Sequence, residues 1–204
     1  MIRIAIIEDQ VMFQDSLARF LGEQADMEVA GVSVDAAGAS GLCRKCSPDL
    51  VLMDVITGSD SNGITAAAQI RKDFPEIKIV VMTALPEITF IDAAKKAGVH
   101  SFIYKNADSQ HLLYVIRSTM KGQGVYPGPA DSSMLSGEAF TDAEIALIRL
   151  VCRGMSRAEI AGALALSEGT VKSLITGILD KTGFDSIMKF AVYAVSNGFI
   201  VPEI

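Results

Sequence analysis

The sequence predicts an α/β domain built on a parallel sheet, followed by a small all-α domain, and two observations point to this fold class. Within residues 1–121, short apolar runs rich in β-branched residues alternate with segments of helical spacing, which is typical of β-α-β units. Beyond residue 138 the apolar spacing is helical only, and the stretch 122–137 is rich in Gly, Pro and Ser, as in a linker. We therefore expect domains at 1–121 and 138–204.

The expected strands of the first domain are short and apolar almost throughout, which indicates a sheet covered by helices on both faces. They lie at 2–7, 28–33, 49–53, 77–82 and 101–104. Helical spacing between the strands is clearest at 11–23 and 64–74. Five strands and five helices in this length favour a flavodoxin-like doubly wound five-stranded parallel sheet. No GxxxxGK[ST] motif follows the first strand, which excludes a P-loop domain.

Four short helices are expected in the second domain, each after a Ser, Thr or Asp that can cap its first turn. The expected N-caps are Thr141, Ser156, Ser167 and either Asp185 or Ser186, and the helices end near Cys152, Leu164, Lys181 and Gly198. A Glu three residues after Thr141 and after Ser156 completes a capping-box signature. Only a few residues separate the second helix from the third, as in a helix-turn-helix.

Composition limits the function classes. Charged residues make up 21% of the chain and hydrophobic residues 50%, so a disordered chain is excluded. A net charge of −6 argues against a polybasic membrane anchor and, taken alone, against a nucleic-acid binder. No apolar run approaches the roughly 20 residues that cross a bilayer. Three Cys make no disulfide framework, and Cys43 and Cys46 are expected to be two positions on one helix, so we expect a cytoplasmic protein.

Candidate site residues, most of them polar, follow four of the five expected strands at their carboxyl ends. They are Glu8 and Asp9, Asp54, Thr83 and Ala84, and Lys105. Ligands of open α/β sheets bind outside these strand ends, so we expect the side chains to share one crevice. Three carboxylates would repel one another unless a cation joined them, and Mg²⁺ prefers such oxygen ligands. A Lys and a hydroxyl beside an Asp suit transfer of a phosphoryl group to that Asp.

Taken singly, each of these residues has an ordinary explanation. Glu8 and Asp9 could begin a loop, Asp54 could be a turn residue at a strand end, and Lys105 could be a solvated charge. The order of all four groups along successive strands favours a shared site over these separate explanations.

This constellation resembles the receiver domain of two-component response regulators over residues 1–121. The resemblance implies that Asp54 accepts a phosphoryl group from a sensor histidine kinase. It implies that Asp9, Asp54 and the backbone carbonyl of Ile56 hold Mg²⁺, with Glu8 assisting through water.

The same resemblance gives roles to the later strand ends. It implies that Thr83, with Ala84 beside it, binds the new phosphate and that Lys105 pairs with it. Phe102 takes the aromatic position that changes rotamer with Thr83, although a plain core side chain explains it equally well. One departure stands beside the acceptor: the loop 57–63 has no Pro and about one residue more than the family pattern. This departure affects the expected dephosphorylation rate and kinase contact.

The second domain resembles the LuxR/NarL-type helix-turn-helix, and the string Leu-Ser-Glu-Gly-Thr-Val-Lys at 166–172 is its most specific match. The resemblance implies that the third helix enters the DNA major groove. Its polar face offers Glu168, Thr170, Lys172, Ser173 and Thr176. Lys172 is the strongest candidate for a base or phosphate contact. The expected partners are a sensor kinase, promoter DNA, a second copy of the chain after phosphorylation and, in addition, RNA polymerase, with no membrane.

The net charge of the second domain bears on how strongly it should bind DNA. Residues 138–204 carry six basic and eight acidic side chains, a net charge of −2. Few cations can therefore reach phosphate, so DNA binding should be weak in the monomer, mildly salt-dependent and reliant on dimerisation. The alternative is a receiver whose degenerate helix-turn-helix acts through protein–protein contacts instead of DNA.

An enzyme of the Mg²⁺-dependent phosphatase class is a further alternative. Such an enzyme needs a second acid within two residues of its nucleophile, and Val55 and Ile56 stand at those places. We therefore expect no independent enzymatic activity, only phosphorylation and dephosphorylation of the protein's own Asp54.

Overall fold

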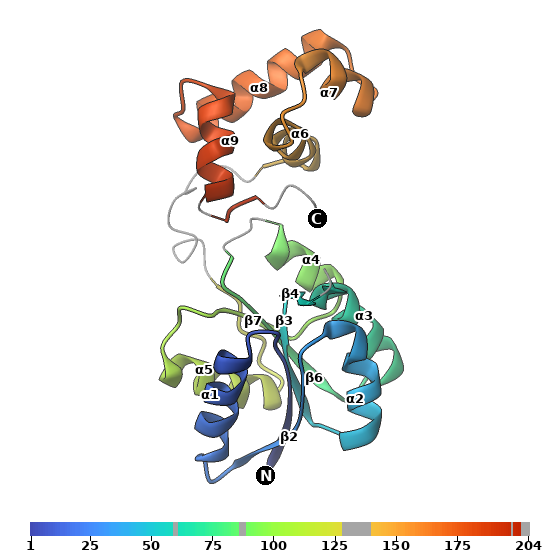
Figure 1. The fold of residues 1–204 in the computed structure, drawn as a ribbon, viewed down its shortest axis with the longest axis vertical. Coiled ribbons are helices and arrows are strands. Elements are labelled where there is room, and N and C mark those ends of the chain that lie inside the picture. Colours follow the sequence, from blue (N-terminus) through green and yellow to red (C-terminus); the bar gives the residue numbers. More distant parts are fainter. Residues whose placement is uncertain (59–60, 86–88, 128–139, 197, 201–204) are drawn as a thin grey trace. The chain divides into compact units, whose positions relative to one another are not determined.

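The chain folds into two compact units in a computed structural model that describes residues 1–58, 61–85, 89–127, 140–196 and 198–200. The first unit comprises Met1–Ala84 and Thr89–Pro127, and the second includes Gly128–Ile204 (Figure 1). The first is α/β and the second contains helices only among its described residues, so the predicted fold class is confirmed.

A five-stranded parallel sheet forms the centre of the first unit, in the order β2-β1-β3-β6-β7. The strands are β1 (Ile2–Ile7), β2 (Met27–Ser33), β3 (Leu50–Asp54), β6 (Lys78–Thr83) and β7 (Ser101–Tyr104). Strand order reverses between β1 and β3, which makes their carboxyl ends the switch point of the doubly wound sheet.

Helices cover both faces of this sheet, with α1 and α5 on one face and α2, α3 and α4 on the other (Figure 1). The helices are α1 (Val11–Gly22), α2 (Ala39–Cys46), α3 (Gly63–Asp73), α4 (Phe90–Lys96) and α5 (Ser109–Met120), with a 3-10 turn η1 (Ala36–Gly38) before α2. Ile4 and Ile6 pack with the core residues of α1 and α5. Ala5 and Ile7 point to the opposite face and are equally buried, because side chains alternate along a strand.

The structure differs from the sequence prediction at two strand ends and in one loop. Asp54 and Thr83 are the last residues of β3 and β6, where the prediction placed them just after the strands. The loop after β3 contains a small antiparallel hairpin, β4 (Ile56–Thr57) with β5 (Ser61–Asn62), which was not predicted. Two-residue strands of mixed polarity leave no periodicity in a sequence, so this hairpin had no signal.

The beginning of the expected linker, residues 122–127, packs against the first unit. The Phe102 N–H donates to the Val125 carbonyl at 2.8 Å, and the Tyr126 hydroxyl donates to the Val99 carbonyl at 2.6 Å. This segment therefore pairs with the outer edge of β7, which would otherwise present unpaired backbone groups. The remainder of the expected linker, 128–137, lies outside the described residues.

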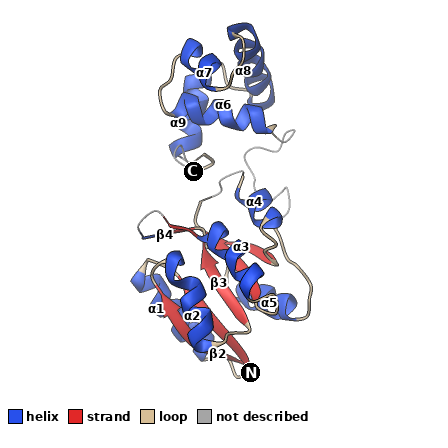
Figure 2. Cartoon of the chain, turned by 90° about the vertical axis from the view of Figure 1, so that its right-hand side faces the viewer, coloured by secondary structure: helices blue, strands red, loops and turns tan. Residues whose placement is uncertain are grey.

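The second unit contains α6 (Asp142–Cys152), α7 (Arg157–Ala163), α8 (Glu168–Thr182) and α9 (Ile187–Ser196), drawn in Figure 2. Both predicted capping boxes are present, at Thr141 and at Ser156. Gly183 ends α8 with a φ of 72°, a conformation that glycine adopts without strain. The Ser186 carbonyl accepts the first hydrogen bond of α9, which decides between the two expected starts.

His100 gives the first unit a predictable response to acid. Its Nδ1 accepts the Ile79 N–H at 3.1 Å, and burial, with nearby Arg71 and Lys78, lowers its pKa to about 4. An unfolded histidine titrates near 6.5, so between these values the unfolded chain binds a proton that the folded chain does not. Stability should therefore fall as pH is lowered from 7 to 4, by about 2 kcal/mol after allowance for partial exposure.

The measurement is urea unfolding at both pH values for the wild type, His100→Asn and the exposed-site control His111→Asn. An asparagine side chain in place of His100 keeps an acceptor without a titratable ring, so that variant should lose less stability on acidification than the other two proteins. Equal losses in all three would show that His100 does not govern the acid response.

Candidate functional site

Lys105 joins two carboxylates at the switch point of the sheet. Glu8 follows β1, Asp54 ends β3 and Lys105 follows β7, so the carboxyl ends of three strands meet here. Lys105 Nζ lies 2.7 Å from Glu8 Oε2 and 2.7 Å from Asp54 Oδ2, and it donates a hydrogen bond to the latter. All three residues are largely buried, which strengthens their electrostatic interaction relative to water.

Asp9 adds a third carboxylate to this group. One ligand oxygen each from Glu8, Asp9 and Asp54 lies within 4.8 Å of the others. Glu8 Oε2 is buried, and its close contact is the ammonium of Lys105 at 2.7 Å. Three carboxylates against one ammonium leave a formal charge of −2, which a divalent cation would balance. The oxygen donors and this charge together fit a hard divalent cation.

Burial and pairing oppose each other in setting the pKa values of these groups. Burial raises the pKa of Glu8 and of Asp54, against the lowering effect of the Lys105 hydrogen bonds. Burial alone would lower the pKa of Lys105, but hydrogen bonds to Asp54 and Glu8 raise it above its ordinary value. Lys105 is therefore a firmly charged ammonium held between two carboxylates.

Thr83 and Phe102 lie on the neighbouring strands. Thr83 ends β6, is 2% exposed, and its carbonyl accepts the Lys105 N–H at 2.8 Å. Ala84 follows it and is exposed. Phe102 is 1% exposed and meets the Tyr104 ring edge to face, so it is a core side chain, and its rotamer change stays a prediction.

Gln14 is a site residue that sequence reasoning missed. Its Nε2 donates to the carbonyls of Glu8, at 2.7 Å, and Ser33, at 2.9 Å, and so fixes the backbone at the ends of β1 and β2. Gln14 lies on the buried face of α1 with Leu17 and Leu21. A polar residue at that helical spacing was the available signal.

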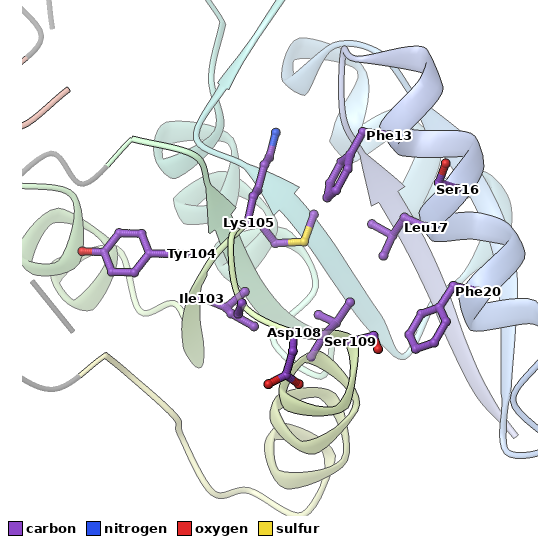
Figure 3. Close-up of a pocket in the computed structure, with 12 residues that line it drawn as sticks. Phe13, Ser16, Leu17, Phe20, Ile103, Tyr104, Lys105, Asp108 and Ser109 are labelled. Carbon is purple, nitrogen blue, oxygen red and sulfur yellow. The ribbon is translucent and has the colours of Figure 1, made fainter. Parts of the chain in front are cut away.

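An apolar cavity of about 210 Å³ lies beside Lys105, between α1 and the start of α5 (Figure 3). Phe13, Leu17 and Phe20 line it from α1, and Ile103 lines it from β7. Lys105 Nζ lies 5.2 Å from the centroid of the Phe13 ring, a cation–π distance.

The candidate DNA-contacting residues all lie at the exposed amino-terminal part of α8. Ser167 caps the helix by accepting the Thr170 N–H at 3.1 Å. The five predicted residues, Glu168, Thr170, Lys172, Ser173 and Thr176, are exposed. Ser173 and Thr176 donate their hydroxyl protons to helix carbonyls four residues earlier. Both hydroxyls therefore present mainly acceptor oxygens to a ligand.

Among the basic residues counted from 138 onward, Lys181 and Lys189 form ion pairs with described residues. Lys181 Nζ lies 2.8 Å from Glu144 Oε2, and Lys189 Nζ lies 2.8 Å from Asp185 Oδ2. Lys172 has no ion pair with any described residue, so it is the cation of α8 that is available to a ligand.

Glu144 should be important for the stability of the second unit. Its Oε2 accepts the Thr141 N–H at 2.7 Å, the Thr141 hydroxyl at 3.1 Å and Lys181 at 2.8 Å, which joins the start of α6 to the end of α8. We expect Glu144→Gln to cost about 2 kcal/mol, because hydrogen bonds to a charged group are lost. Calorimetry would follow the transition of this unit.

The matched control is Glu159→Gln, which alters the second capping box at an exposed position without a lysine. A loss as large as that of Glu144→Gln would show that the cap, and not the link to α8, carries the effect.

Two known protein families match this chain, one over each of its two units. The model for the response regulator receiver domain matches residues 4–117, more than half of the chain. The chain is a response regulator. A second model, for bacterial regulatory proteins of the luxR family, matches residues 138–194 of this response regulator. The predicted family is thereby confirmed in both parts.

A curated relative aligns with nearly the whole chain. The response regulator protein VraR of Staphylococcus aureus is 28% identical over 207 residues, which cover 98% of this chain and 99% of VraR.

Solved structures of response regulators share the fold. RcsB of Salmonella enterica serovar Typhimurium, bound to promoter rprA with the phosphomimetic BeF3−, aligns with a TM-score of 0.70 at 18% identity, covering 98% of this chain and all of that one. A second structure, described as the response regulator RcsB–DNA complex, has a TM-score of 0.71 at 20% identity, covering 95% of this chain and 98% of that one. At these identities the likeness establishes the fold of this response regulator.

The described helices of the response regulator include none long and apolar enough to cross a membrane. Cys43 and Cys46 lie on α2, as expected, and burial raises the pKa of the Cys43 thiol to about 11.

Proposed function

We propose that the protein is a phosphorylation-controlled regulator of transcription in which Asp54 accepts a phosphoryl group from a sensor histidine kinase. The observation that carries the proposal is the position of Lys105 Nζ, 2.7 Å from both Glu8 and Asp54 at the switch point of the sheet. Asp9, Asp54 and the Ile56 carbonyl would hold Mg²⁺, with Glu8 acting through water. The group of three carboxylates, with one oxygen each within 4.8 Å of the others, supports this metal assignment.

Transfer needs little more than positioning and charge neutralisation. An Asp54 carboxylate oxygen attacks the phosphorus of the donor in line, the bond from phosphorus to the donor nitrogen breaks, and the imidazole leaves with the electron pair. Bound Mg²⁺ would offset the charge on the transferring oxygens. Lys105 pairs with the phosphate oxygens, and the Thr83 hydroxyl donates a hydrogen bond to them. The protein has no further substrate in this scheme and catalyses only its own phosphorylation and dephosphorylation.

Phosphorylation adds about two negative charges beside Lys105 and favours an arrangement in which Thr83 moves inward and Phe102 changes rotamer. Dimerisation follows and places two α8 helices on promoter DNA, where RNA polymerase is a further partner. An apolar stripe on α9 supports dimerisation: Met188, Val192 and Val195 are 51%, 62% and 42% exposed at helical spacing. An RcsB structure described as two dimers bound to two parallel DNAs supports it by analogy.

The test is incubation with Mg²⁺ and acetyl phosphate, with intact mass and oligomeric state followed together. The wild type should gain the mass of one phosphoryl group and shift toward a dimer, whereas Asp54→Asn should do neither. A wild-type chain that gained no mass would refute the proposal.

A second candidate function is regulation by protein–protein contact through a helix-turn-helix that does not read DNA. The pairing of Lys181 with the largely buried Glu144 favours it, since this lysine is then unavailable to a phosphate backbone. A gel shift with the phosphorylated protein distinguishes the candidates. Binding to promoter DNA that is lost in Lys172→Ala supports DNA reading, whereas absent binding, or binding unchanged in the variant, supports protein contact.

A further inference from the structure

The loop 57–63, which departs from the family pattern, is anchored by the side chain of Thr57. The proposed function gives this side chain no role. Between Asp54 and α3 the chain forms the hairpin β4–β5, in which Ile56 pairs with Asn62 and Thr57 with Ser61. Two strands of two residues are too short to be stable alone. The described residues of this loop include no proline to stiffen it, so its conformation depends on contacts to other elements.

Thr57 makes the principal contact of that kind. Its side chain is 2% exposed, and its Oγ1 accepts the backbone N–H of Ala36, at the start of η1, at 2.9 Å. The same hydroxyl lies 3.4 Å from the Ser61 carbonyl, within reach of a hydrogen bond across the hairpin. The Ser61 side chain in turn lies beside the Asp35 carboxylate and lowers its pKa. Both β4 and β5 therefore contact the turn that follows β2.

Ile56 lies in the chain between the anchored residue Thr57 and the proposed phosphoryl acceptor Asp54. Its backbone lies close enough to the Asp54 carboxylate to oppose the rise in the pKa of that group, and its carbonyl belongs to the proposed cation ligands. On the other strand, Asn62 caps α3 by accepting the N–H groups of Ile64 and Thr65 at 2.9 and 3.0 Å. The orientation of the Ile56 peptide is therefore fixed by the hairpin, and the hairpin is fixed by Thr57.

We propose that Thr57 is a positioning residue of the cation site, whose hydroxyl holds the Ile56 peptide in place by anchoring the β4–β5 hairpin to the Ala36 N–H. The inference rests on the proposed function, because it assumes that the acid group binds Mg²⁺. Groups that orient a metal ligand through a hydrogen bond commonly change metal affinity by about 10–100-fold when removed. Thr57 touches neither the metal site nor the phosphate directly, so its effect would pass through Ile56.

The experiment compares Thr57→Val, which removes the hydroxyl at nearly constant volume, with Thr57→Ser, which keeps it. Calorimetric titration of the full chain with MgCl2 measures cation affinity without any phosphoryl transfer. Thr57→Val should weaken Mg²⁺ binding by about tenfold, and Thr57→Ser should restore it to within about twofold of wild type. Ser61→Ala, which removes only the side-chain contact with Asp35, provides a milder variant and should weaken binding in the same direction.

Thr119→Val is the matched control. Thr119 is also a buried threonine of the first unit, and its hydroxyl bonds Ser101 Oγ at 2.6 Å and the Val115 carbonyl at 2.7 Å, at the amino end of β7. Its loss should lower the melting temperature and leave the Mg²⁺ affinity unchanged.

The possible outcomes distinguish a failure of the proposed cation site from a failure of the role assigned to Thr57. A wild-type chain that binds no Mg²⁺ would overturn the proposed cation site itself. Wild-type binding with unchanged affinity in Thr57→Val and Ser61→Ala would overturn the role of Thr57 alone. Equal weakening in Thr57→Val and Thr119→Val would assign the effect to general destabilisation and also overturn it.

Discussion

Gly63→Ala should destabilise the receiver domain by more than about 3 kcal/mol and abolish phosphorylation of Asp54. A Cβ on Gly63 would stand 1.8 Å from the carbonyl oxygen of Asp54 and 2.9 Å from its carbonyl carbon. Neither atom can withdraw, because Asp54 is the last residue of β3 and the Gly63 N–H donates to the Val55 carbonyl at 2.7 Å. The variant must therefore break this bond or displace the acceptor.

The measurement is urea unfolding together with the mass gain from acetyl phosphate. Gly41→Ala is the control, because Gly41 is an exposed helical glycine of α2 with nothing within 4 Å of an added Cβ. Alanine there should be neutral or stabilising by about 1 kcal/mol, as helix propensity predicts. Wild-type stability and phosphorylation in Gly63→Ala would contradict the close approach of the α3 start to Asp54.

The fold could be read from the sequence because its elements are long and periodic. The five buried strands and the capping boxes at Thr141 and Ser156 are local signals, and the elements whose ends were predicted formed within a residue or two of those ends. The hairpin after Asp54 and the pairing of residues 122–127 with β7 depend on tertiary contacts. Their sequences are polar or glycine-rich, so no pattern indicates them.

The acid site could be assembled from the sequence for a topological reason. Parallel strands bring their carboxyl ends to one edge, so Glu8, Asp54 and Lys105 had to meet once the strands were known. The roles of Gln14 and Thr57 could not be deduced in this way. Each acts by bonding a particular backbone group, and the identity of that group depends on packing that a single sequence does not encode locally.

The ion pairs of individual basic side chains in the second domain could not be predicted from the sequence either. Counting charge beyond residue 138 predicted few cations for DNA, but it could not say which ones were already paired. The structure ties Lys181 to Glu144 across 37 residues of sequence, which makes that lysine part of the scaffold of α8. The expected DNA binding by the monomer, weak and mildly salt-dependent, should therefore depend mainly on Lys172.

Lys105→Met should destabilise the metal-free receiver domain by about 3 kcal/mol, because it leaves two buried carboxylates without their shared cation. Methionine keeps the apolar stem that lines the cavity with Phe13, so the effect reports charge and not lost volume. The measurement is urea unfolding in EDTA. Lys189→Met is the control: Lys189 and Asp185 are 67% and 73% exposed, and removal of such a pair should cost less than about 1 kcal/mol.

Added MgCl2 then tests whether the ammonium and the divalent cation neutralise the same charges. With Lys105 present, Glu8, Asp9 and Asp54 leave a formal charge of −2, and without it −3, so the variant should bind Mg²⁺ more tightly than the wild type. Because a ligand that binds only the folded state stabilises it more the further its concentration exceeds the dissociation constant, MgCl2 should restore more stability to Lys105→Met than it adds to the wild type. Equal stabilisation of both proteins would mean that Lys105 and the cation act on separate groups, and the shared site would have to be abandoned.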